Sequence, residues 1–332
     1  MKRHGNLYPQ IVQYDNIILA YEKARKGKRW QDTIKRFEKH LEDNILKIQE
    51  ALINKTFTTS PYTMMTIHEP KKRIIYKLPF NPDRIVHHAL MNILEQIWSG
   101  LFLSDSYACR RGYGLHAASR RTMEHIRTVG RNGYCLKLDI SKFYPSVDHD
   151  ILFNIVQNKI KCRDTLWLLA NIIYSIPCGK NVPIGNYTSQ WLGNLYLNEL
   201  DQYLKHEYHI KNYVRYCDDF LILHNDKGFL NVIAHVITEF VQNRLDMKLS
   251  KCDLFPIKRG IDFVGYRHFP EYVLLRKSTA LRIKKRLKKL PLEFKSGIIT
   301  SEQYRSILAS IRGWLRWANT NNLQLNMGLK NA

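Results

Sequence analysis

The sequence has few acidic residues for its length. Lys and Arg number 52 against 29 Asp and Glu, which gives a formal net charge of +23 over 332 residues. A surplus of this size favours a polyanionic partner, with nucleic acid first and an acidic membrane surface second. The alternative without a partner is a basic surface that is simply solvated. With 45% hydrophobic residues the chain can bury a core, so wholesale disorder is not expected.

Long apolar runs are also missing. The longest, residues 165–176, contains Asn171 and Tyr174. It is shorter than the roughly 18–20 residues that a membrane-spanning helix needs. The first residues lead into no apolar segment with a small-residue cleavage site, so we expect no secretory signal. These absences predict a protein without a membrane partner.

The cysteines and histidines form no recognisable ligand pattern. The six cysteines are scattered and include no Cys-x-x-Cys pair, and the thirteen histidines show no His-Glu-x-x-His spacing. Neither a zinc site nor a disulfide framework is indicated, and a reducing, cytoplasmic environment fits best. No repeat and no low-complexity linker divides the chain.

Helical and strand-like segments both occur, which predicts the α+β class. Residues 1–50 carry apolar positions at helical spacing, and the segments 56–59 and 73–76 are β-prone. Short strand-like and helical runs alternate over 134–270. Two further helices are predicted in the last stretch of the chain, where they form a small helical subdomain.

The first of these two helices is strongly basic. Residues 276–295 hold nine Lys or Arg against one acid, Glu293, and have apolar residues at helical spacing after Ser278, a candidate N-cap. Such a cationic face is either a solvated surface or a track for a nucleic-acid backbone, and the near-absence of acids favours the track. The second helix begins at Thr300 and Gln303, which have capping-box spacing.

An acidic residue lies near the end of a predicted buried strand. Residues 134–140 are mostly apolar, and Asp139 is the second-last of them. A carboxylate at such a place is costly unless it is paired or bound to a metal. Asp148, farther along, is predicted to cap a helix.

Two more carboxylates lie in a predicted hairpin. Asp218 and Asp219 stand between two β-prone runs in residues 213–223, a pattern that a plain β-turn also produces. Adjacent carboxylates repel each other unless a cation lies nearby. Together with Asp139 they suggest a two-metal site. Oxygen ligands select Mg²⁺, and two ions about 3.5–4 Å apart can clamp the attacking and leaving oxygens of a phosphoryl transfer.

These segments resemble the motifs of reverse transcriptases, and the resemblance extends from about residue 50 to the C-terminus. Residues 134–146 resemble palm motif A, and Tyr216-Cys217-Asp218-Asp219 resembles the Y-x-D-D box of motif C. Five other segments resemble the two fingers motifs, motif B, motif D and motif E, the primer grip: residues 69–75, 106–116, 183–190, 249–251 and 263–266. In the second fingers motif Arg111 stands where the family usually has proline.

The resemblance implies a right-hand polymerase fold of the α+β class. Its fingers, its palm (an antiparallel sheet with helices) and its helical thumb divide the chain into three parts. An N-terminal extension and the fingers would occupy residues 1–133, with the first palm helix near 82–104. The palm would occupy 134–270 and the thumb 271–332.

The resemblance also implies the reaction and its catalytic residues. A primer 3′-OH attacks the α-phosphate of a deoxynucleotide, with RNA as the template. Asp139 and Asp218 bind two Mg²⁺ ions, for which Mn²⁺ can substitute, and Ile140 lends a backbone carbonyl. Asp219 completes the acidic cluster as a third catalytic residue.

Substrate contacts are carried over in the same way. Lys71 and Arg73 would hold the β- and γ-phosphates, and backbone N–H groups of residues 141–144 would cradle phosphate. Tyr144 would lie under the deoxyribose and leave no room for a 2′-OH, with core packing as the alternative role. The predicted dNTP-binding residues are Lys71, Arg73, Arg110, Ser141, Phe143, Tyr144, Ile184, Gln190 and Lys251. The predicted primer and template residues are Tyr216, Gly265, Tyr266, Arg276, Lys277, Lys284, Lys285 and Lys288.

Motif B points to one branch of the family. Intron and retroviral enzymes usually carry Gln-Gly before the motif B helix, whereas this chain has Ile184-Gly185 followed by Ser189-Gln190, which is similar to reverse transcriptases of diversity-generating retroelements. Such bacterial or phage-encoded enzymes copy a structured template-repeat RNA into cDNA with errors opposite adenines. They work with RNA template, DNA or cDNA primer, dNTPs and a basic accessory variability protein.

Three alternatives stay open at this point. Two are reverse transcriptases of another kind, either a stand-alone defence enzyme or a group II intron-like enzyme. The third is a non-catalytic RNA-binding scaffold, which would explain the positive charge but not Asp139, Asp218 and Asp219 together.

Overall fold

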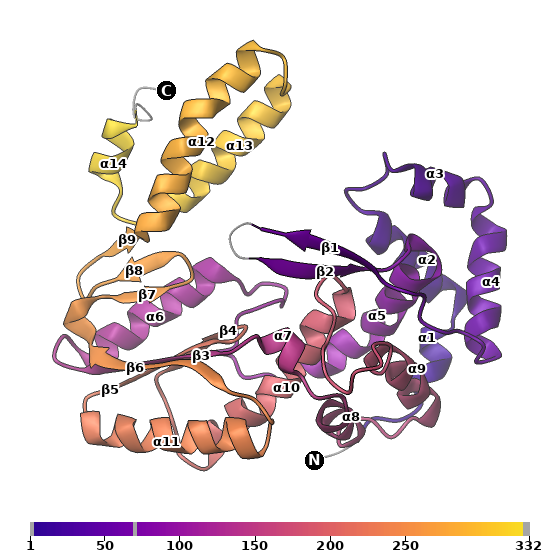
Figure 1. The fold of residues 1–332 in the computed structure, drawn as a ribbon, viewed down its shortest axis with the longest axis horizontal. Helices are drawn as coiled ribbons and strands as arrows, with labels where there is room; N and C mark the ends of the chain where they lie inside the picture. The colour runs from indigo at the N-terminus through magenta and orange to yellow at the C-terminus, as the bar shows by residue number, and fades with distance from the viewer. Residues whose placement is uncertain (1–2, 69–71, 328–332) are drawn as a thin grey trace. The chain divides into compact units, whose positions relative to one another are not determined.

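The chain forms two compact units, each assembled from three separate stretches of sequence. The computed structural model describes residues 3–68 and 72–327, and Figure 1 shows their helices and strands. The first unit consists of residues 1–104, 140–209 and 237–249, and the second of residues 105–139, 210–236 and 250–332.

The first unit is mainly helical and is built around α2 (Tyr14–Arg25) and α5 (Ile85–Ser99). Ile17, Ala20, Tyr21 and Ala24 recur at helical spacing in α2 and are all buried, and this face packs along α5. The helix expected near 82–104 is therefore present as α5. The other helices of the unit are α1 (Tyr8–Ile11), α3 (Asp32–Glu38), α4 (Leu41–Ile53), η1 (Phe80–Arg84), α7 (Phe143–Ser146), α8 (His149–Gln157), α9 (Arg163–Ile173) and α10 (Tyr187–His206).

A two-stranded hairpin completes the first unit. Strands β1 (Thr63–Ile67) and β2 (Arg73–Lys77) pair antiparallel, with Met65 opposite Ile75. The β-prone segment 73–76 is thus a strand. The segment 56–59 is not, because Asn171 takes its hydrogen-bonding groups: the Thr59 N–H donates to the Asn171 side chain over 2.8 Å.

The main sheet has four strands in the order β4-β5-β3-β6, with bounds Tyr213–Tyr216, Asp219–His224, Tyr134–Ile140 and Leu249–Pro256. Strand β3 lies between β5 and β6, and its apolar residues are buried, as the sequence predicts. The predicted hairpin is β4 and β5, which pair antiparallel. Helix α6 (Leu115–Val129) packs against both of these strands, and α11 (Lys227–Asn243) follows β5.

A smaller sheet and two long helices form the C-terminal part of the second unit. Strands β7 (Ile261–Phe263), β8 (Tyr266–His268) and β9 (Val273–Leu275) form a meander after η2 (Ile257–Arg259). Helices α12 (Lys277–Lys295) and α13 (Ser301–Arg316) pack side by side and precede α14 (Asn321–Asn326) (Figure 1). Ile283, Ile311 and Leu315 are buried in a core with Tyr266.

Three predicted helix starts can be compared with the structure. The capping box of Thr300 and Gln303 is present, and Asp148 accepts the N–H groups that open α8. The predicted N-cap Ser278 is wrong. Helix α12 begins earlier, because the carbonyl of Arg276 already accepts the N–H of Ala280 over 2.9 Å.

The α+β class is confirmed. The predicted division at residues 133 and 270 rests on motif resemblance and stays a prediction. None of the helices in the described ranges has the length and apolar content that crossing a membrane would require.

Candidate active site

Two of the three predicted catalytic aspartates lie side by side on neighbouring strands of the main sheet. Asp139 of β3 is the register partner of Asp219, the first residue of β5. Directly opposed residues of an antiparallel pair place their side chains on the same face of the sheet. Two carboxylates that the sequence separates widely are therefore neighbours on one face.

The third aspartate lies in the turn of the β4–β5 hairpin. Tyr216 pairs with Asp219, and Cys217 and Asp218 form the turn between them. Cys217 has a positive φ of 54°, in the left-handed region that non-glycine residues rarely occupy. The fully buried guanidinium of Arg215 donates to the Cys217 carbonyl over 3.1 Å, which holds this turn in place.

The charge of Asp219 is set by its burial and its neighbours. The pKa of its carboxyl is raised to about 6: burial is the largest cause, Lys137 opposes the rise, and the carboxylates of Asp139 and Asp218 add to it. Lys137 Nζ lies 3.3 Å from Asp219 Oδ2. The other oxygen, Oδ1, is buried without a hydrogen-bond partner among the described residues. Three neighbouring carboxylates and one lysine leave a negative charge that a bound cation can offset.

The donor set fits a hard divalent cation. Carboxylate oxygens are the ligands that Mg²⁺ and Mn²⁺ prefer, and the unpartnered Oδ1 of Asp219 supplies an oxygen that nothing else uses. Ser250 Oγ donates to Asp139 Oδ2 over 2.6 Å and so orients that carboxylate. Within the described ranges no three His, Cys, Asp or Glu side chains form a ready-made metal cluster. The ligand set Asp139, Ile140 and Asp218 therefore stays a prediction.

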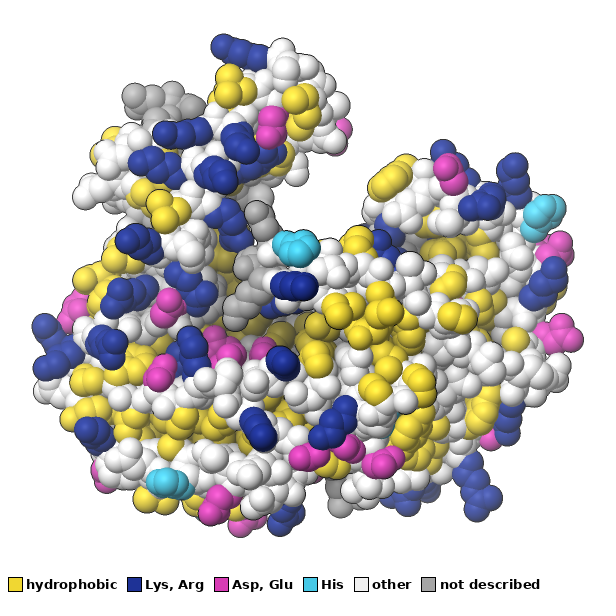
Figure 2. Space-filling model, in the orientation of Figure 1, with side chains coloured by type: hydrophobic (Ala, Val, Ile, Leu, Met, Phe, Trp, Pro, Cys, Tyr) yellow, Lys and Arg dark blue, Asp and Glu magenta, His cyan; other side chains and the backbone are white. Residues whose placement is uncertain are grey.

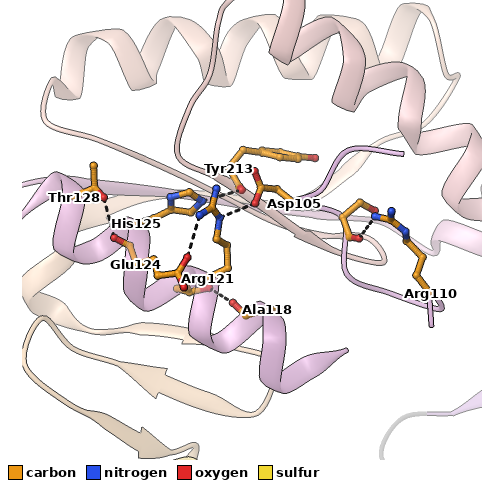
Figure 3. A network of polar contacts seen from close by, with 10 residues as sticks. Asp105, Arg110, Ala118, Arg121, Glu124, His125, Thr128 and Tyr213 are labelled. Carbon is orange, nitrogen blue, oxygen red and sulfur yellow. Dashed lines mark hydrogen bonds and ion pairs between the residues drawn. The ribbon is translucent and has the colours of Figure 1, made fainter. Parts of the chain in front are cut away.

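A polar network fixes α6 beside strand β4 (Figure 3). Arg121 donates to Asp105 over 2.7 Å and to Glu124 over 3.0 Å, and Asp105 is almost fully buried. His125 Nε2 lies 3.2 Å from the backbone carbonyl of Tyr213, the first residue of β4. The side of β4 away from its partner strand is thus tied to the helix.

The segment that carries Arg110 is attached to the same strand. The Arg215 N–H donates to the carbonyl of Asp105, and the Tyr107 N–H donates to the carbonyl of Arg215, each over 2.9 Å. Arg110 in turn donates to the carbonyl of Ser106 over 2.8 Å (Figure 3). The segment of Arg110, a predicted dNTP contact, is therefore attached to the strand that ends in the Cys217–Asp218 turn.

Strand β2 contacts the loop before α10, which carries the predicted nucleotide residue Ile184. The Tyr76 N–H donates to the carbonyl of Ile184 over 2.8 Å. Gly185 has φ +120°, and a Cβ there would lie 2.7 Å from the Tyr76 carbonyl oxygen, so only glycine allows this approach. Arg73 is exposed at the start of β2. Lys71, its predicted partner in binding phosphate, lies outside the described residues.

Tyr144 and Phe143 pack against one position of α10. A Cβ on Gly193 would lie 3.1 Å from the Phe143 ring and 3.2 Å from the Tyr144 ring. Phe143 is buried and Tyr144 is half-buried, so packing dominates for the first and the second keeps an accessible face. The Ser141 N–H donates to the Lys248 carbonyl over 2.8 Å and is not available to a phosphate.

The remaining predicted dNTP contacts are exposed. Gln190 lies in the first turn of α10, and Lys251 lies in β6. Next to Gln190, Ser189 is buried and donates to the Pro183 carbonyl over 2.7 Å. Ser189 therefore holds the motif B loop, while Gln190 remains accessible.

The predicted primer-grip residues differ in their exposure. Tyr266 is fully buried: it shares a 2.9 Å hydrogen bond with His116 Nε2 and stacks on Trp314. Its ring therefore serves the packing of α13, and the primer contacts of Gly265 and Tyr266 stay predictions. Tyr216 is half-buried against the core.

The basic residues of α12 are mostly exposed. Figure 2 shows Lys and Arg side chains spread over α12 and α13. Arg276 at the helix start is ion-paired with Asp262. The other predicted template contacts, all with exposed side chains, are Lys277, Lys284, Lys285 and Lys288.

Sequence reasoning missed several residues that shape the site. Lys137 precedes Asp139 by two positions in a strand, so alternation alone places both on one face. Arg215 interrupts the apolar run before Asp218, and a charged residue at such a place indicates a specific polar partner. Gly193, inside a long helix, was a signal for close packing.

Comparison with known proteins identifies the family of the chain. Residues 67–268 match the family described as reverse transcriptase (RNA-dependent DNA polymerase). The chain is 26% identical over 235 residues to protein YkfC of Escherichia coli K12, which covers 57% of this chain and 61% of YkfC. It is also 26% identical over 243 residues to the group II intron-encoded protein LtrA of Lactococcus lactis subsp. cremoris, covering 66% of this chain and 39% of LtrA. The chain thus spans less than two thirds of either relative.

A solved structure shares the fold. Apo telomerase from Candida tropicalis superposes with a TM-score of 0.52 at 10% identity, over 70% of this chain and 52% of the telomerase chain. Likeness at this identity shows the fold alone. With the antiparallel sheets and helices described above, it confirms the predicted right-hand polymerase fold.

Proposed function

Because the chain belongs to the reverse transcriptase (RNA-dependent DNA polymerase) family, we propose that it copies a template-repeat RNA into cDNA for a diversity-generating retroelement. The observation that best supports polymerase activity is the pairing of Asp139 in β3 with Asp219 in β5. Asp218 lies in the turn directly before β5. The retroelement assignment rests on the Ile184-Gly185 and Ser189-Gln190 pairs of motif B.

The acidic residues would prepare the two ends of the reaction. Bound Mg²⁺ supplies the charge that lowers the pKa of the primer 3′-OH and neutralises the leaving pyrophosphate. Asp139, Asp218 and the carbonyl of Ile140 would hold the ions. Ser250 orients Asp139 through its 2.6 Å hydrogen bond, and Lys137 lowers the pKa of Asp219 and so favours its charged form.

The substrate is recognised by charge and by shape. Lys71 and Arg73 would bind the β- and γ-phosphates, Arg73 through its bidentate fork. Tyr144 would exclude a 2′-OH with the ring face that its packing on Gly193 leaves accessible. The RNA template and its DNA or cDNA primer would follow the exposed lysines of α12.

The setting of the reaction is part of the same proposal. The protein would act in the cytoplasm of a bacterium or in phage infection, together with an accessory variability protein. A gene near a pair of almost identical repeats that differ mainly at adenines would support this setting.

Primer extension tests the polymerase. The purified protein should extend a DNA primer on an RNA template when Mg²⁺ or Mn²⁺ is added, and Asp218→Ala should not. A wild-type protein that binds RNA but never extends the primer, under either metal, would leave the scaffold interpretation instead.

Sequencing of the cDNA tests the retroelement assignment. On a template that contains all four bases, substitutions should concentrate opposite adenines. The matched variant is Ile184→Gln, which restores the Gln-Gly pair of intron enzymes and should reduce those errors. A group II intron-like enzyme is the second candidate, because LtrA is an intron-encoded protein. Equal error rates opposite all four template bases would favour it.

A further inference from the structure

A turn in the first unit carries a dense positive charge beside an exposed tryptophan. Residues 23–30 follow one another as Lys-Ala-Arg-Lys-Gly-Lys-Arg-Trp, and we call them the basic turn. The Trp30 side chain is 73% exposed. Tryptophan usually buries most of its large apolar surface. An indole left in water among five cations is therefore a candidate binding surface.

The basic turn has a definite shape. The Lys28 N–H donates to the Arg25 carbonyl over 2.9 Å, and the Gln31 N–H donates to the Lys28 carbonyl over 3.0 Å. Beside it lies a shallow cavity of about 420 Å³, whose lining includes Lys23, Arg25, Lys26 and Arg29 and one acid, Glu22. Figure 2 shows several Lys and Arg side chains on the part of the surface that carries α3.

The nearby acids are outnumbered, because Glu22 lines the cavity together with four cationic side chains. Glu38 is engaged by Arg25 over 2.9 Å and by the Tyr21 hydroxyl over 2.7 Å. Lys26 and Lys28 have no ion-pair partner within the part of the chain that the structure describes. The basic turn therefore keeps most of its charge for a ligand.

Neighbouring cations add to the same field. Burial lowers the pKa of Lys28, and Arg84 lowers it further. His88 lies in the same field: burial and the charges of Lys23, Lys28 and Arg84 lower its pKa to about 4. Like charges gathered in this way are relieved by a bound anion.

We propose that the basic turn is an RNA-binding surface outside the active site, with phosphates against Lys26, Lys28 and Arg29 and an unpaired base stacked on Trp30. The choice of RNA rests on the proposed function. The surface fits a single-stranded segment, because an exposed ring can stack only on a base that is not already paired. It would hold a structured RNA while another part of that RNA is copied.

The size of each contribution can be estimated. Stacking of one base on an aromatic ring contributes about 1–3 kcal/mol, which corresponds to a five- to 150-fold change in affinity. Each phosphate contact to single-stranded nucleic acid adds about 0.7 to the slope of log K against log salt. Loss of two contacts should therefore lower the slope by about 1.4.

Fluorescence anisotropy tests the surface. The probe is a labelled RNA hairpin with a single-stranded oligo(rU) tail, compared with the same hairpin without the tail. Trp30→Ala should weaken binding of the tailed hairpin at least about fivefold, and Trp30→Phe should keep it. Lys26→Gln with Arg29→Gln should weaken binding about tenfold and reduce the salt dependence.

A matched variant removes equal charge elsewhere. Lys39 and Lys47 are exposed on the same unit but lie outside the basic turn. The double variant Lys39→Gln and Lys47→Gln should bind the probe like the wild type. Equal losses in both double variants, or wild-type binding by Trp30→Ala, would overturn the proposal. The proposal would also be overturned if the basic-turn variants bound the RNA probe like the wild type and lost only their binding to phosphatidylserine vesicles.

The test separates this surface from the polymerase activity. Extension of oligo(dT) on a short poly(rA) template should be unchanged in the basic-turn variants, because such a template lacks the structured RNA. If the wild type fails to extend but the variants still lose the tailed hairpin, the RNA surface stands and the proposed function falls. If extension occurs and all variants bind alike, the surface falls and the function stands.

Discussion

Lys137 Nζ lies 3.3 Å from Oδ2 of Asp219, on the strand that also carries Asp139. Among the influences on Asp219, this lysine lowers the carboxyl pKa, while burial and the two other aspartates raise it. The acidic cluster therefore contains its own cation. Lys137 also donates to the backbone carbonyl of Asp262, which limits how far it can move.

Loss of that lysine should move the pH dependence of activity. With the pKa of Asp219 near 6, its carboxyl ionises as the pH rises through that value. Lys137→Met removes the charge that lowers this pKa, so the acidic limb should shift to higher pH. Initial rates should fall about tenfold at pH 6.5 and much less at pH 8.5. Lys159→Met, which breaks a 3.0 Å pair with Glu199, is the control and should leave the profile in place.

Asp139→Asn and Asp218→Asn should each abolish extension. Removing one carboxylate takes away an oxygen ligand that the reaction needs, so the rate should fall about 10³-fold or more. Saturating Mg²⁺ should stabilise the wild type by about 1–3 kcal/mol and the variants much less. Thermal unfolding with and without Mg²⁺ measures this second effect. An active Asp218→Asn protein would remove that residue from the mechanism.

Tyr144→Ala should admit ribonucleotides. The shorter side chain opens the space that the 2′-OH would occupy, so the preference for dNTP over NTP should fall by roughly tenfold or more. Single-nucleotide extension with paired dNTP and NTP series gives the ratio. Unchanged discrimination would assign the Tyr144 ring to packing.

Gly185→Ala should loosen the junction between β2 and the loop before α10. The new Cβ would lie 2.7 Å from the Tyr76 carbonyl oxygen, at a φ that alanine adopts only under strain. We expect a loss of about 1–3 kcal/mol in stability and a higher KM for dNTP. Gly112 also has a positive φ, of +79°, but open space around it, so Gly112→Ala should raise KM less.

His268 should make stability fall in mild acid. Its Nδ1 donates to the Ile261 carbonyl and its Nε2 accepts from Ser119, so the folded protein holds it neutral. Burial lowers its pKa to about 4, although the backbone bond to Ile261 and Asp262 raise it and Lys137 lowers it. The unfolded chain binds a proton below about pH 6.5, so the contribution is present above that pH and is lost as the pH falls toward 4.

Denaturant unfolding at pH 7.5 and pH 5 measures this contribution. The wild type should lose about 2 kcal/mol more between the two pH values than His268→Gln. Equal losses in the two proteins would show that His268 titrates alike in the folded and unfolded states.

The chemistry was predictable from the sequence because it depends on local patterns. Asp139 comes near the end of an apolar run, and Asp218-Asp219 stands between two β-prone runs. Each pattern predicts a carboxylate at the end of a strand. Placing them on one face needed only the antiparallel register, which the structure supplies. Resemblance in the surrounding motifs extended the prediction to the nucleotide residues.

Other features were out of reach because they depend on tertiary contacts. The segment 56–59 has strand propensity, but hydrogen bonds from Asn171 hold it in an irregular path. Tyr266 looked like a primer contact, yet His116 and Trp314 bury its ring. Asn171 is far in sequence from residues 56–59, and His116 and Trp314 are far from Tyr266. No local sequence pattern therefore predicts these contacts.

The interleaving of the two units has a consequence for biosynthesis. Residues 1–104 leave the ribosome before the remainder of their unit, residues 140–209 and 237–249, which emerge between pieces of the other unit. The apolar faces of α2 and α5 can pack with each other early, whereas other contacts of that unit must wait for late segments. A single cut at any position between residues 105 and 249 would divide at least one of the two units between the fragments.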